Sequence, residues 1–450
     1  MSKAAHISVR GRRGRAADGA THECVIGEDL KIDLQALQDY CALLLREIEH
    51  DLVVVCGAVM YADRMVSRRR ASGWARDLEV TLPVNVPEAW RQQQVMAALV
   101  DALEFVSGDH WRFNFVAGAE RVAVAQSSID FNMGPYVIVP FSDGLDSFLQ
   151  WKLLGKEEPD VKVLRIQTSN RGTNEKRNRS IDRTGLQEDQ RLRLPVSAAV
   201  GSHPEQSYRT RTFVYFCMAA LAAAKAKTAR VIIGENGVGA LGPSMIAYGN
   251  ECSHRTAHPA YTRRLAKFLN ALLGTNIVFE HPQRLRTKGE VLKHALALGI
   301  TGWEHTNSCV RGPRDRLRQM ACGACANCLL RRTALLAAGI EPKGFFWENL
   351  GGNSLDRGRG NPMGREARDH DWDIARHGAH VMGELAELAK LEAQAPVYLR
   401  AAWELNGPVQ SGLGQAAAEI HRLVQAHAKE WEALLGYFGE SEILNFKQAG

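Results

Sequence analysis

Hydrophobic and polar positions in the first part of the chain follow both helical and strand periods. Apolar residues recur at helical spacing in residues 34–50 and 87–106. Short apolar or alternating runs, which are typical of strands, occupy residues 51–60, 77–84 and 111–118. The mixture predicts an N-terminal α/β domain over residues 1–133, and the basic start of this domain is a candidate for disorder.

A second pattern begins at Tyr136, where short apolar strands alternate with helices. The predicted strands cover residues 136–140, 161–168, 191–200 and 230–235. An alanine-rich helix over residues 212–229 precedes the last of them. Strand and helix in repeated order predict a parallel sheet covered by helices, and such sheets bind ligands at the carboxyl ends of their strands. We therefore expect an α/β domain over residues 134–349.

The last hundred residues have a different composition. Residues 351–371 are rich in glycine, arginine and aspartate, which is typical of a linker or a mobile loop. Two stretches with helical periodicity follow, at residues 380–396 and 414–438. Residues 350–450 are therefore predicted to form a linker and a helical C-terminal region.

The amino-acid composition indicates the class of protein, and the positions of the basic residues show a charge pattern. The 450 residues are 45% hydrophobic and 24% charged, as in a soluble globular protein. No apolar run reaches membrane-spanning length and the N-terminus lacks the apolar core of a signal peptide, so we expect a cytoplasmic protein with no membrane partner. The formal net charge is +6, and basic residues cluster at positions 10–15, 68–70 and 171–183. These clusters suit either a polyanion such as nucleic acid or ordinary solvated loops.

The sequence SDGLDS, residues 142–147, lies between the predicted strand 136–140 and a predicted helix. Backbone N–H groups at a helix N-terminus, a glycine that allows close approach and flanking hydroxyls suit a phosphate or pyrophosphate. A Walker loop would carry a lysine directly before the last serine, where this chain has Asp146. A simple strand-to-helix turn capped by aspartate or serine has the same composition, so the turn alone leaves both interpretations open.

Four cysteines form a second constellation. Cys322, Cys325 and Cys328 are each separated by two residues, and Cys309 precedes them by twelve intervening residues. Four thiolates at this spacing can surround one tetrahedral zinc ion, which would be structural because all four positions are filled by protein. A CxxCxxC run also ligates iron–sulfur clusters, so that alternative stays open. The other cysteines show no ligand spacing and are expected to be unpaired thiols.

The two motifs together carry a family resemblance. SDGLDS resembles the pyrophosphate-binding loop of the PP-loop ATP pyrophosphatases, whose usual pattern is Ser, Gly, Gly, any residue, Asp, Ser. The four cysteines, with TKGEVLKHALALGI (287–300) before them and LLRRTALLAAGI (329–340) after the last, resemble the QueC-like enzymes, the 7-cyano-7-deazaguanine synthases. The similarity covers residues 136–345. The added N-terminal and C-terminal regions resemble the enlarged QueC-like proteins of bacterial anti-phage systems, the QatC type.

The resemblance implies that ATP, Mg²⁺ and Zn²⁺ bind to this chain. The pyrophosphate of ATP would lie against the loop, with Asp146 as the contact to magnesium. The loop positions concerned are Ser142, Asp143, Gly144, Leu145, Asp146 and Ser147. Asp143 departs from the family's glycine, and its carboxylate would repel a pyrophosphate unless it points outward or meets magnesium. Zinc would be held by Cys309, Cys322, Cys325 and Cys328.

Other positions of the resemblance concern the nucleotide pocket and the reacting groups. Gln167 and Thr168, which close the second strand of this domain, lie near the family's nucleotide pocket. Arg209 and Arg211 stand where the family has a basic segment, and we expect them to be catalytic together with Asp146 and Ser147. Two guanidinium groups there suit a triphosphate or a carboxylate. The alternative is a pair of solvated arginines at a helix start.

Polar residues after the strand predicted at 230–235 are the candidate substrate site. Glu235 and Asn236 follow a strand end and suit the amine and ring N–H edge of a deazapurine. Arg255, Thr256 and His258 could orient a carboxylate or relay a proton. Each has an ordinary alternative, namely a turn former, a surface arginine or a hydrogen-bonded core histidine.

The activity implied by the resemblance is ATP-dependent adenylylation of a carboxylated 7-deazaguanine, followed by attack of an amine to give an amide or a nitrile. Ammonia is the expected donor, and the amine of a partner protein is a close alternative. Two further functions stay open. One is tRNA thiolation with an iron–sulfur cluster on the cysteines, and the other is a non-catalytic nucleotide-binding role in a defence complex.

Overall fold

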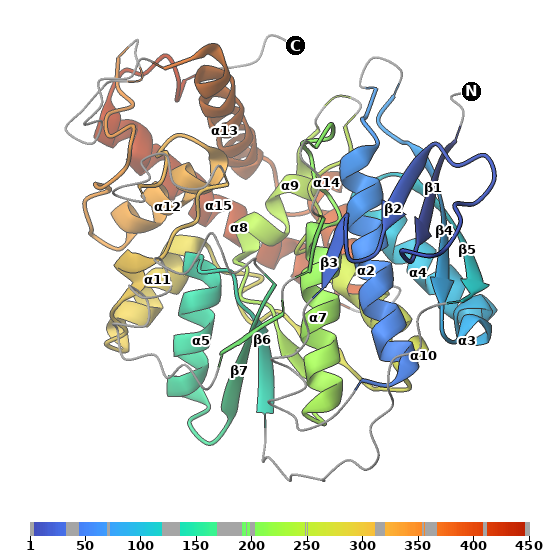
Figure 1. Ribbon diagram of the computed structural model, residues 1–450. Coiled ribbons are helices and arrows are strands. Elements are labelled where there is room, and N and C mark those ends of the chain that lie inside the picture. Colours follow the sequence, from blue (N-terminus) through green and yellow to red (C-terminus); the bar gives the residue numbers. More distant parts are fainter. Residues whose placement is uncertain are drawn as a thin grey trace. The chain divides into compact units, whose positions relative to one another are not determined.

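The computed structural model describes residues 4–32, 45–69, 73–118, 136–168, 191–194, 196–198, 203–247, 249, 251–310, 320–352, 355, 367–407 and 412–445. The chain divides into two compact units that interleave along the sequence (Figure 1). The first unit contains Met1–Ser142, Glu157–Ile233 and Tyr248–His281, and the second contains Asp143–Lys156, Gly234–Ala247 and Pro282–Gly450.

The three predicted sequence domains, with boundaries after residues 133 and 349, remain a prediction. The basic segment 171–183 and most of the predicted linker 351–371 lie outside the described residues.

The first unit contains a four-stranded parallel sheet. Its strand order is β2 (His22–Val25), β1 (Ala5–Arg10), β4 (Asp77–Val84) and β5 (His110–Ala117). β4 and β5 confirm two of the predicted strands, and the predicted helix 87–106 forms α3 (Pro87–Arg91) and α4 (Gln93–Ser107). β1 and β2 lie in the basic start, where no strand was predicted. The possible disorder of this start remains a prediction.

Residues 51–60, predicted as a strand, belong to helix α2 (Glu47–Met65), so this prediction is wrong. α2 contacts β3 (Leu30–Ile32), β4, β9 (Val196–Ala198) and α7 (Arg211–Lys225), and every residue from Leu52 to Ala62 is buried. A helix that is surrounded by protein needs no polar face. Its apolar run therefore lacks the 3.6-residue period, and the pattern cannot separate it from a buried strand.

The first unit also contains a five-stranded parallel sheet, and a parallel sheet was predicted for this part of the chain. The order is β11 (Val278–Glu280), β10 (Arg230–Ile232), β6 (Tyr136–Pro140), β7 (Lys162–Gln167) and β8 (Arg191–Arg193). Helix α7 packs against β6, β7 and β10, and α10 (Pro259–Leu273) packs against β11.

The strand predicted at residues 191–200 is corrected by the structure. It forms two short strands in different sheets, because β8 joins the parallel sheet whereas β9 pairs antiparallel with β3. The proline between them in the sequence has no N–H group for a ladder, which accounts for the interruption.

The second unit is helical in its described part. Its helices are α5 (Leu145–Glu157), α8 (Gly237–Ala240), α9 (Gly242–Met245), α11 (Lys288–Ala297), η3 (Trp303–His305), α12 (Ala326–Ala337), α13 (Asp369–Glu387), η4 (Leu388–Lys390), α14 (Pro396–Asn406) and α15 (Leu413–Phe438). α15 packs against α8, α12, α13 and α14. The described residues of the predicted C-terminal region are helical, and α13 and α15 pack against α12, the helix that contains Cys328. That this region is a separate appendage remains a prediction.

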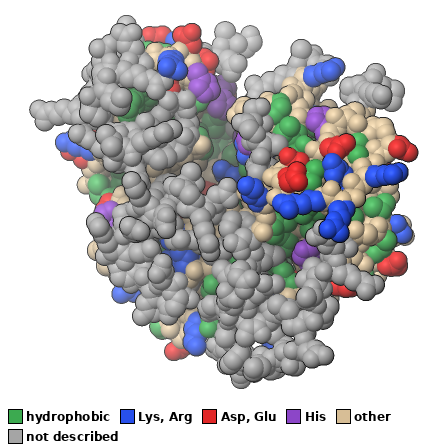
Figure 2. All heavy atoms as spheres, viewed as in Figure 1, with side chains coloured by type: hydrophobic (Ala, Val, Ile, Leu, Met, Phe, Trp, Pro, Cys, Tyr) green, Lys and Arg blue, Asp and Glu red, His purple; other side chains and the backbone are tan. Residues whose placement is uncertain are grey.

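Charged residues at the N-terminal start have partners of opposite sign. Arg10 Nε lies 3.1 Å from Glu23 Oε2, and Arg12 Nε lies 3.6 Å from Glu28 Oε1. Figure 2 shows basic and acidic side chains next to one another over the part of the molecule that contains β1 and β2. This pairing favours the solvated-loop interpretation of the first basic cluster. Among the helices of the described residues, none combines the length and the apolar character that a membrane crossing requires.

Candidate functional site

The SDGLDS turn joins β6 to α5, as predicted. Because α5 begins at Leu145, residues 145–147 form a first helical turn whose N–H groups have no partner within the helix and favour an anion. The Ser147 hydroxyl donates to the carbonyl of Gly144 at 3.2 Å. Asp143 is buried and has φ of +56°, in the left-handed region. Glycine adopts this conformation without steric cost, which explains the glycine in the usual pattern of this loop.

We expect Asp143→Gly to stabilise the fold and to tighten ATP binding. The left-handed backbone costs a residue with a Cβ atom up to about 1 kcal/mol. The carboxylate would also repel a bound pyrophosphate, so its removal should lower the Kd for ATP by on the order of tenfold. Thermal denaturation and titration calorimetry with ATP and magnesium measure the two effects.

A second variant, Asp143→Asn, separates these causes. Asparagine tolerates the left-handed region, and this substitution removes only the charge. It should therefore lower the Kd for ATP and leave the melting temperature unchanged. If neither variant binds ATP more tightly than the wild type, the carboxylate does not face the nucleotide.

Asp146 is the centre of a polar cluster in the second unit. Its Oδ2 atom lies 2.7 Å from Lys288 Nζ, and its Oδ1 atom accepts from Asn236 Nδ2 at 3.0 Å. The same Nδ2 donates to Glu235 Oε1 at 2.9 Å, and Asn236 Oδ1 accepts from the N–H of Gly239 at 3.1 Å. The structure therefore brings together three of the predicted site residues, and the amide of Asn236 positions the two carboxylates.

Lys288 is a functional candidate that sequence reasoning missed. Its side chain is 3% exposed and forms an ion pair with Asp146. It is the first residue of α11, where a cation opposes the helix dipole. This unfavourable placement was the one signal in the sequence that could have identified Lys288, because a lysine at a helix start needs an acidic partner. An ammonium group beside the loop suits a phosphate oxygen, as lysine does in other phosphate sites.

Close packing fixes the distance between α5 and residues 234–236. A Cβ atom at Gly234 would lie 2.8 Å from the carbonyl oxygen of Asp146 and 2.7 Å from Cβ of Gln150. Only glycine fits against the backbone at this distance. The contact brings Asn236 to Asp146, and the two carboxylates beside it offer the oxygen ligands that magnesium prefers.

Gln167, Thr168, Arg209 and Arg211 lie in the first unit. Gln167 and Thr168 are buried at the end of β7, and Gln167 Oε1 accepts from Arg191 Nε at 2.9 Å. Arg209 is buried, with its guanidinium 4.7 Å from the centre of the Trp74 ring and 3.9 Å from Glu251. Arg211 is exposed at the start of α7. The two arginines thus have different surroundings, and their catalytic role remains a prediction.

Arg255, Thr256 and His258 precede α10 in the first unit. The guanidinium of Arg255 stacks 4.7 Å above the Phe105 ring, and Thr256 is half-buried. His258 is fully buried and caps α10, because its Nδ1 atom accepts from the N–H of Ala260 at 3.0 Å. Burial, assisted by Arg255, Arg263 and Arg264, lowers the pKa of His258 to about 3. The ring is therefore neutral at pH 7 and serves as a helix cap.

The depressed pKa of His258 predicts loss of stability in acid. Below pH 6.5 the unfolded chain takes up a proton that the folded protein does not bind, so the free energy of unfolding falls as the pH falls from 6.5 towards 3. The loss at pH 5 relative to pH 7 is about 2 kcal/mol. Urea unfolding between pH 5 and 8 measures it, and His258→Asn, which retains a capping side chain, should show a smaller slope. An equal slope in both proteins would contradict this assignment.

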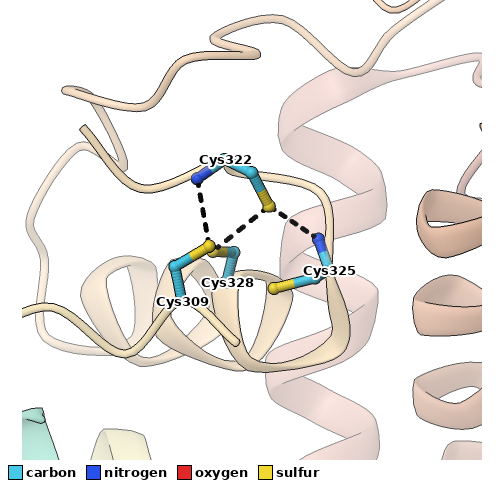
Figure 3. Close-up of side chains that lie close together, drawn as sticks. All are labelled: Cys309, Cys322, Cys325 and Cys328. Carbon is cyan, nitrogen blue, oxygen red and sulfur yellow. Dashed lines mark hydrogen bonds between the residues drawn. The ribbon is translucent and has the colours of Figure 1, made fainter. Parts of the chain in front are cut away.

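The four predicted cysteines converge in the second unit (Figure 3). Their sulfur atoms all lie within 4.8 Å of one another, and those of Cys322 and Cys328 are 3.8 Å apart. Four sulfurs about 2.3 Å from one zinc ion in a tetrahedron are about 3.8 Å apart, so the arrangement fits zinc. Two backbone N–H groups point into the cluster, from Cys322 to Cys309 Sγ and from Cys325 to Cys322 Sγ, both at 3.4 Å.

The four thiols of this cluster cannot all ionise without a bound cation. Hydrogen bonds from Cys322, Cys325 and Cys328 lower the pKa of Cys309, whereas hydrogen bonds with the other three cysteines and burial raise the pKa of Cys328. Crowded thiolates repel one another, and a cation is needed to hold four of them. The donor set therefore fits a metal ion.

Arg332 of α12 supports the turn that carries the ligands. It is fully buried and donates to the carbonyls of Gly323 at 2.9 Å, Pro342 at 3.0 Å and Trp347 at 2.5 Å. Gly323, between Cys322 and Cys325, has φ of +87°, which glycine adopts readily. These contacts support the turn between Cys322 and Cys325.

Comparison with known families gives one match to the chain. The family model described as "Queuosine biosynthesis protein QueC" matches residues 196–339, about a third of the chain. No curated protein matches. The matched segment contains Asn236, Lys288 and all four cysteines, whereas the SDGLDS loop lies before it. The match supports a QueC-like family, which uses ATP, for this part of the protein.

Proposed function

We propose that this protein adenylylates a carboxylated 7-deazaguanine with ATP and transfers the activated acyl group to an amine. The observation that carries the proposal is the contact of Asp146, in the first turn of α5, with Lys288 and Asn236. This cluster combines a carboxylate for a hard cation, an ammonium group for a phosphate and helix N–H groups for an anion. The match to the QueC family supports the use of ATP.

The proposed reaction has two steps. A carboxylate oxygen of the deazaguanine attacks the α-phosphorus of ATP, and the bond from that phosphorus to the bridging oxygen breaks, which releases pyrophosphate. An amine then attacks the acyl carbon, AMP departs with the electron pair of the carbon–oxygen bond, and the nitrogen loses a proton. The product is an amide. A second adenylylation of the amide oxygen would lead to the nitrile.

Each residue of the cluster has its own role in the proposed reaction. The N–H groups of Asp146 and Ser147 and the Lys288 ammonium bind the departing pyrophosphate and stabilise its charge. Magnesium, held by Asp146, would supply positive charge to the phosphate oxygens. Glu235, positioned through Asn236, accepts from the N–H edge of the deazaguanine. The four cysteines hold zinc and take no part in the reaction.

We further propose that the protein belongs to the enlarged QatC-type branch and acts in anti-phage defence. Support for this branch is the protein outside the matched segment: a four-stranded parallel sheet within residues 5–117 and the helices α13, α14 and α15. These regions would supply docking surface for a partner protein whose amine could replace ammonia as the acceptor.

The test uses purified protein with ATP, magnesium and 7-carboxy-7-deazaguanine, with and without ammonium. We expect AMP and pyrophosphate in amounts that depend on the deazaguanine, and mass spectrometry of the product identifies the acceptor. AMP release that required tRNA, or no release with any acceptor, would count against the proposal.

A further inference from the structure

A short segment connects the cysteine cluster to the SDGLDS loop. We call residues Asn307, Ser308 and Cys309 the bridging segment. The N–H of Asn307 donates to the carbonyl of Asp143 at 3.0 Å, and the N–H of Leu145 donates to Ser308 Oγ at 3.3 Å. The next residue, Cys309, is the first cysteine of the cluster. One end of the segment therefore contacts the loop, and the other end is a metal ligand.

The bridging segment is also held in shape internally. The N–H of Cys309 donates to Asn307 Oδ1 at 2.8 Å, and the N–H of Cys322 donates to Cys309 Sγ at 3.4 Å. The position of Cys309 therefore determines the position of Asn307. These bonds form a continuous path from the second half of the cysteine motif to the backbone of the loop.

A side chain from α12 fixes the residues before the bridging segment. Arg331 Nη1 donates to Thr306 Oγ1 at 2.7 Å, and Arg331 Nη2 lies 3.3 Å from the carbonyl oxygen of Trp303. α12 begins at Ala326 and contains Cys328. Residues 303–309 are thus held by the cysteine-bearing helix at one end and by the cluster at the other.

The two contacts with the loop set the direction of its N–H groups. A trans peptide is planar, so its carbonyl and N–H point in opposite directions. When Asn307 holds the carbonyl of Asp143, the N–H of Gly144 points away from the bridging segment. Asp143 also has φ of +56°, a conformation that persists in a residue with a Cβ atom only when surrounding contacts enforce it. The bridging segment supplies such contacts.

We propose that the bridging segment couples metal binding at the cysteine cluster to the shape of the nucleotide loop, with Asn307 and Ser308 as positioning residues. A metal ion bonded to Cys309 and to Cys322, Cys325 and Cys328 ties residues 307–309 to α12. Loss of the ion frees Cys309 and, through it, the contacts at Asp143 and Leu145. This inference rests on the proposed function, because it assumes that the loop binds ATP.

The first experiment compares ATP binding with and without zinc. Titration calorimetry with ATP and magnesium is run on zinc-loaded protein and on protein stripped by a chelator. We expect zinc removal to weaken ATP binding by about tenfold, and ATP to tighten zinc binding by the same factor because coupling between binding equilibria is reciprocal. Equal affinity in both forms overturns the inference while leaving the proposed function intact.

The second experiment removes the contact and keeps the metal. Ser308→Ala should retain one zinc per chain and bind ATP about tenfold more weakly, and zinc removal should then have little further effect because the two changes act on one path. Ser308→Thr retains the hydroxyl and should restore tight binding. The matched control is Thr301→Ala, at an exposed position six residues before Asn307, which should behave as the wild type.

Hydrogen exchange separates failure of the inference from failure of the proposed function. Exchange at the Leu145 amide should become faster on zinc removal and in Ser308→Ala, whether or not ATP binds. If zinc-loaded protein binds no ATP, the proposed function fails, and the part of the inference that assigns a nucleotide to the loop fails with it. Unchanged exchange at Leu145 overturns the coupling itself.

Discussion

In the Asp146→Asn variant, AMP formation from ATP and the carboxylated deazaguanine is expected to fall by about 10²–10³-fold. Asparagine has the size of aspartate, and its oxygen can still accept from Asn236 Nδ2, so the chain should still fold. Because the buried Lys288 loses its acidic partner, we expect a lower melting temperature than in the wild type. The variant lacks the negative charge that lies 2.7 Å from Lys288 Nζ and would hold magnesium. The charge that stabilises the transition state is therefore lost while the shape of the site is kept.

Rates of AMP and pyrophosphate release at saturating ATP measure this effect, and the melting temperature reports on the fold. Asp160→Asn is the matched control, because Asp160 is exposed in the turn after α5 and should leave the rate unchanged. Full activity in Asp146→Asn would remove the SDGLDS loop from the reaction, and the proposed mechanism would have to be abandoned.

The Cys328→Ser variant is expected to lose its metal and much of its stability. Serine is a poor ligand for zinc, and three thiolates without the fourth bind it less tightly. Loss of a structural metal belongs to the few changes that cost more than about 4 kcal/mol, which corresponds to roughly 10 °C in melting temperature for a domain of this size. Cys328 is fully buried at the start of α12, so the helix loses its anchor.

Elemental analysis and thermal denaturation test the cysteine prediction together. The wild type should contain about one zinc per chain, and the variant less than a tenth of that. Cys252→Ser is the control, since Cys252 is a free thiol outside the cluster and its replacement should leave the metal in place. A purified wild-type protein with iron and visible absorption would show that the four cysteines hold an iron–sulfur cluster instead.

Local sequence patterns were sufficient to predict an element or a site where a residue's surroundings follow from its neighbours in the chain. The strands at 77–84 and 136–140 have the apolar and alternating runs of a sheet, and both form as predicted. The cysteine cluster was predictable for the same reason, because three of its ligands lie within seven residues of one another.

Hydrophobic periodicity failed to predict helix α2 because this helix is buried on all sides. The run from Leu52 to Ala62 is apolar throughout because sheet and helices surround it. Periodicity reports only a contrast between a buried face and a solvated one, so a segment without that contrast gives no sign of its helix. The ordered strand β1 was missed in a similar way, since its charged end hid a short apolar core of Ile7 and Val9.

The sequence by itself determined the chemistry that is available: a loop suited to a phosphate, four thiols at metal-binding spacing and a parallel-sheet framework. Only the tertiary structure decided which distant groups meet. Lys288 and Asp146 are 142 residues apart and form an ion pair, and Ser308 lies 163 residues from the Leu145 amide that donates to it. Such contacts depend on how helices pack, which is the sum of many weak interactions across the fold and leaves no pattern in either local segment.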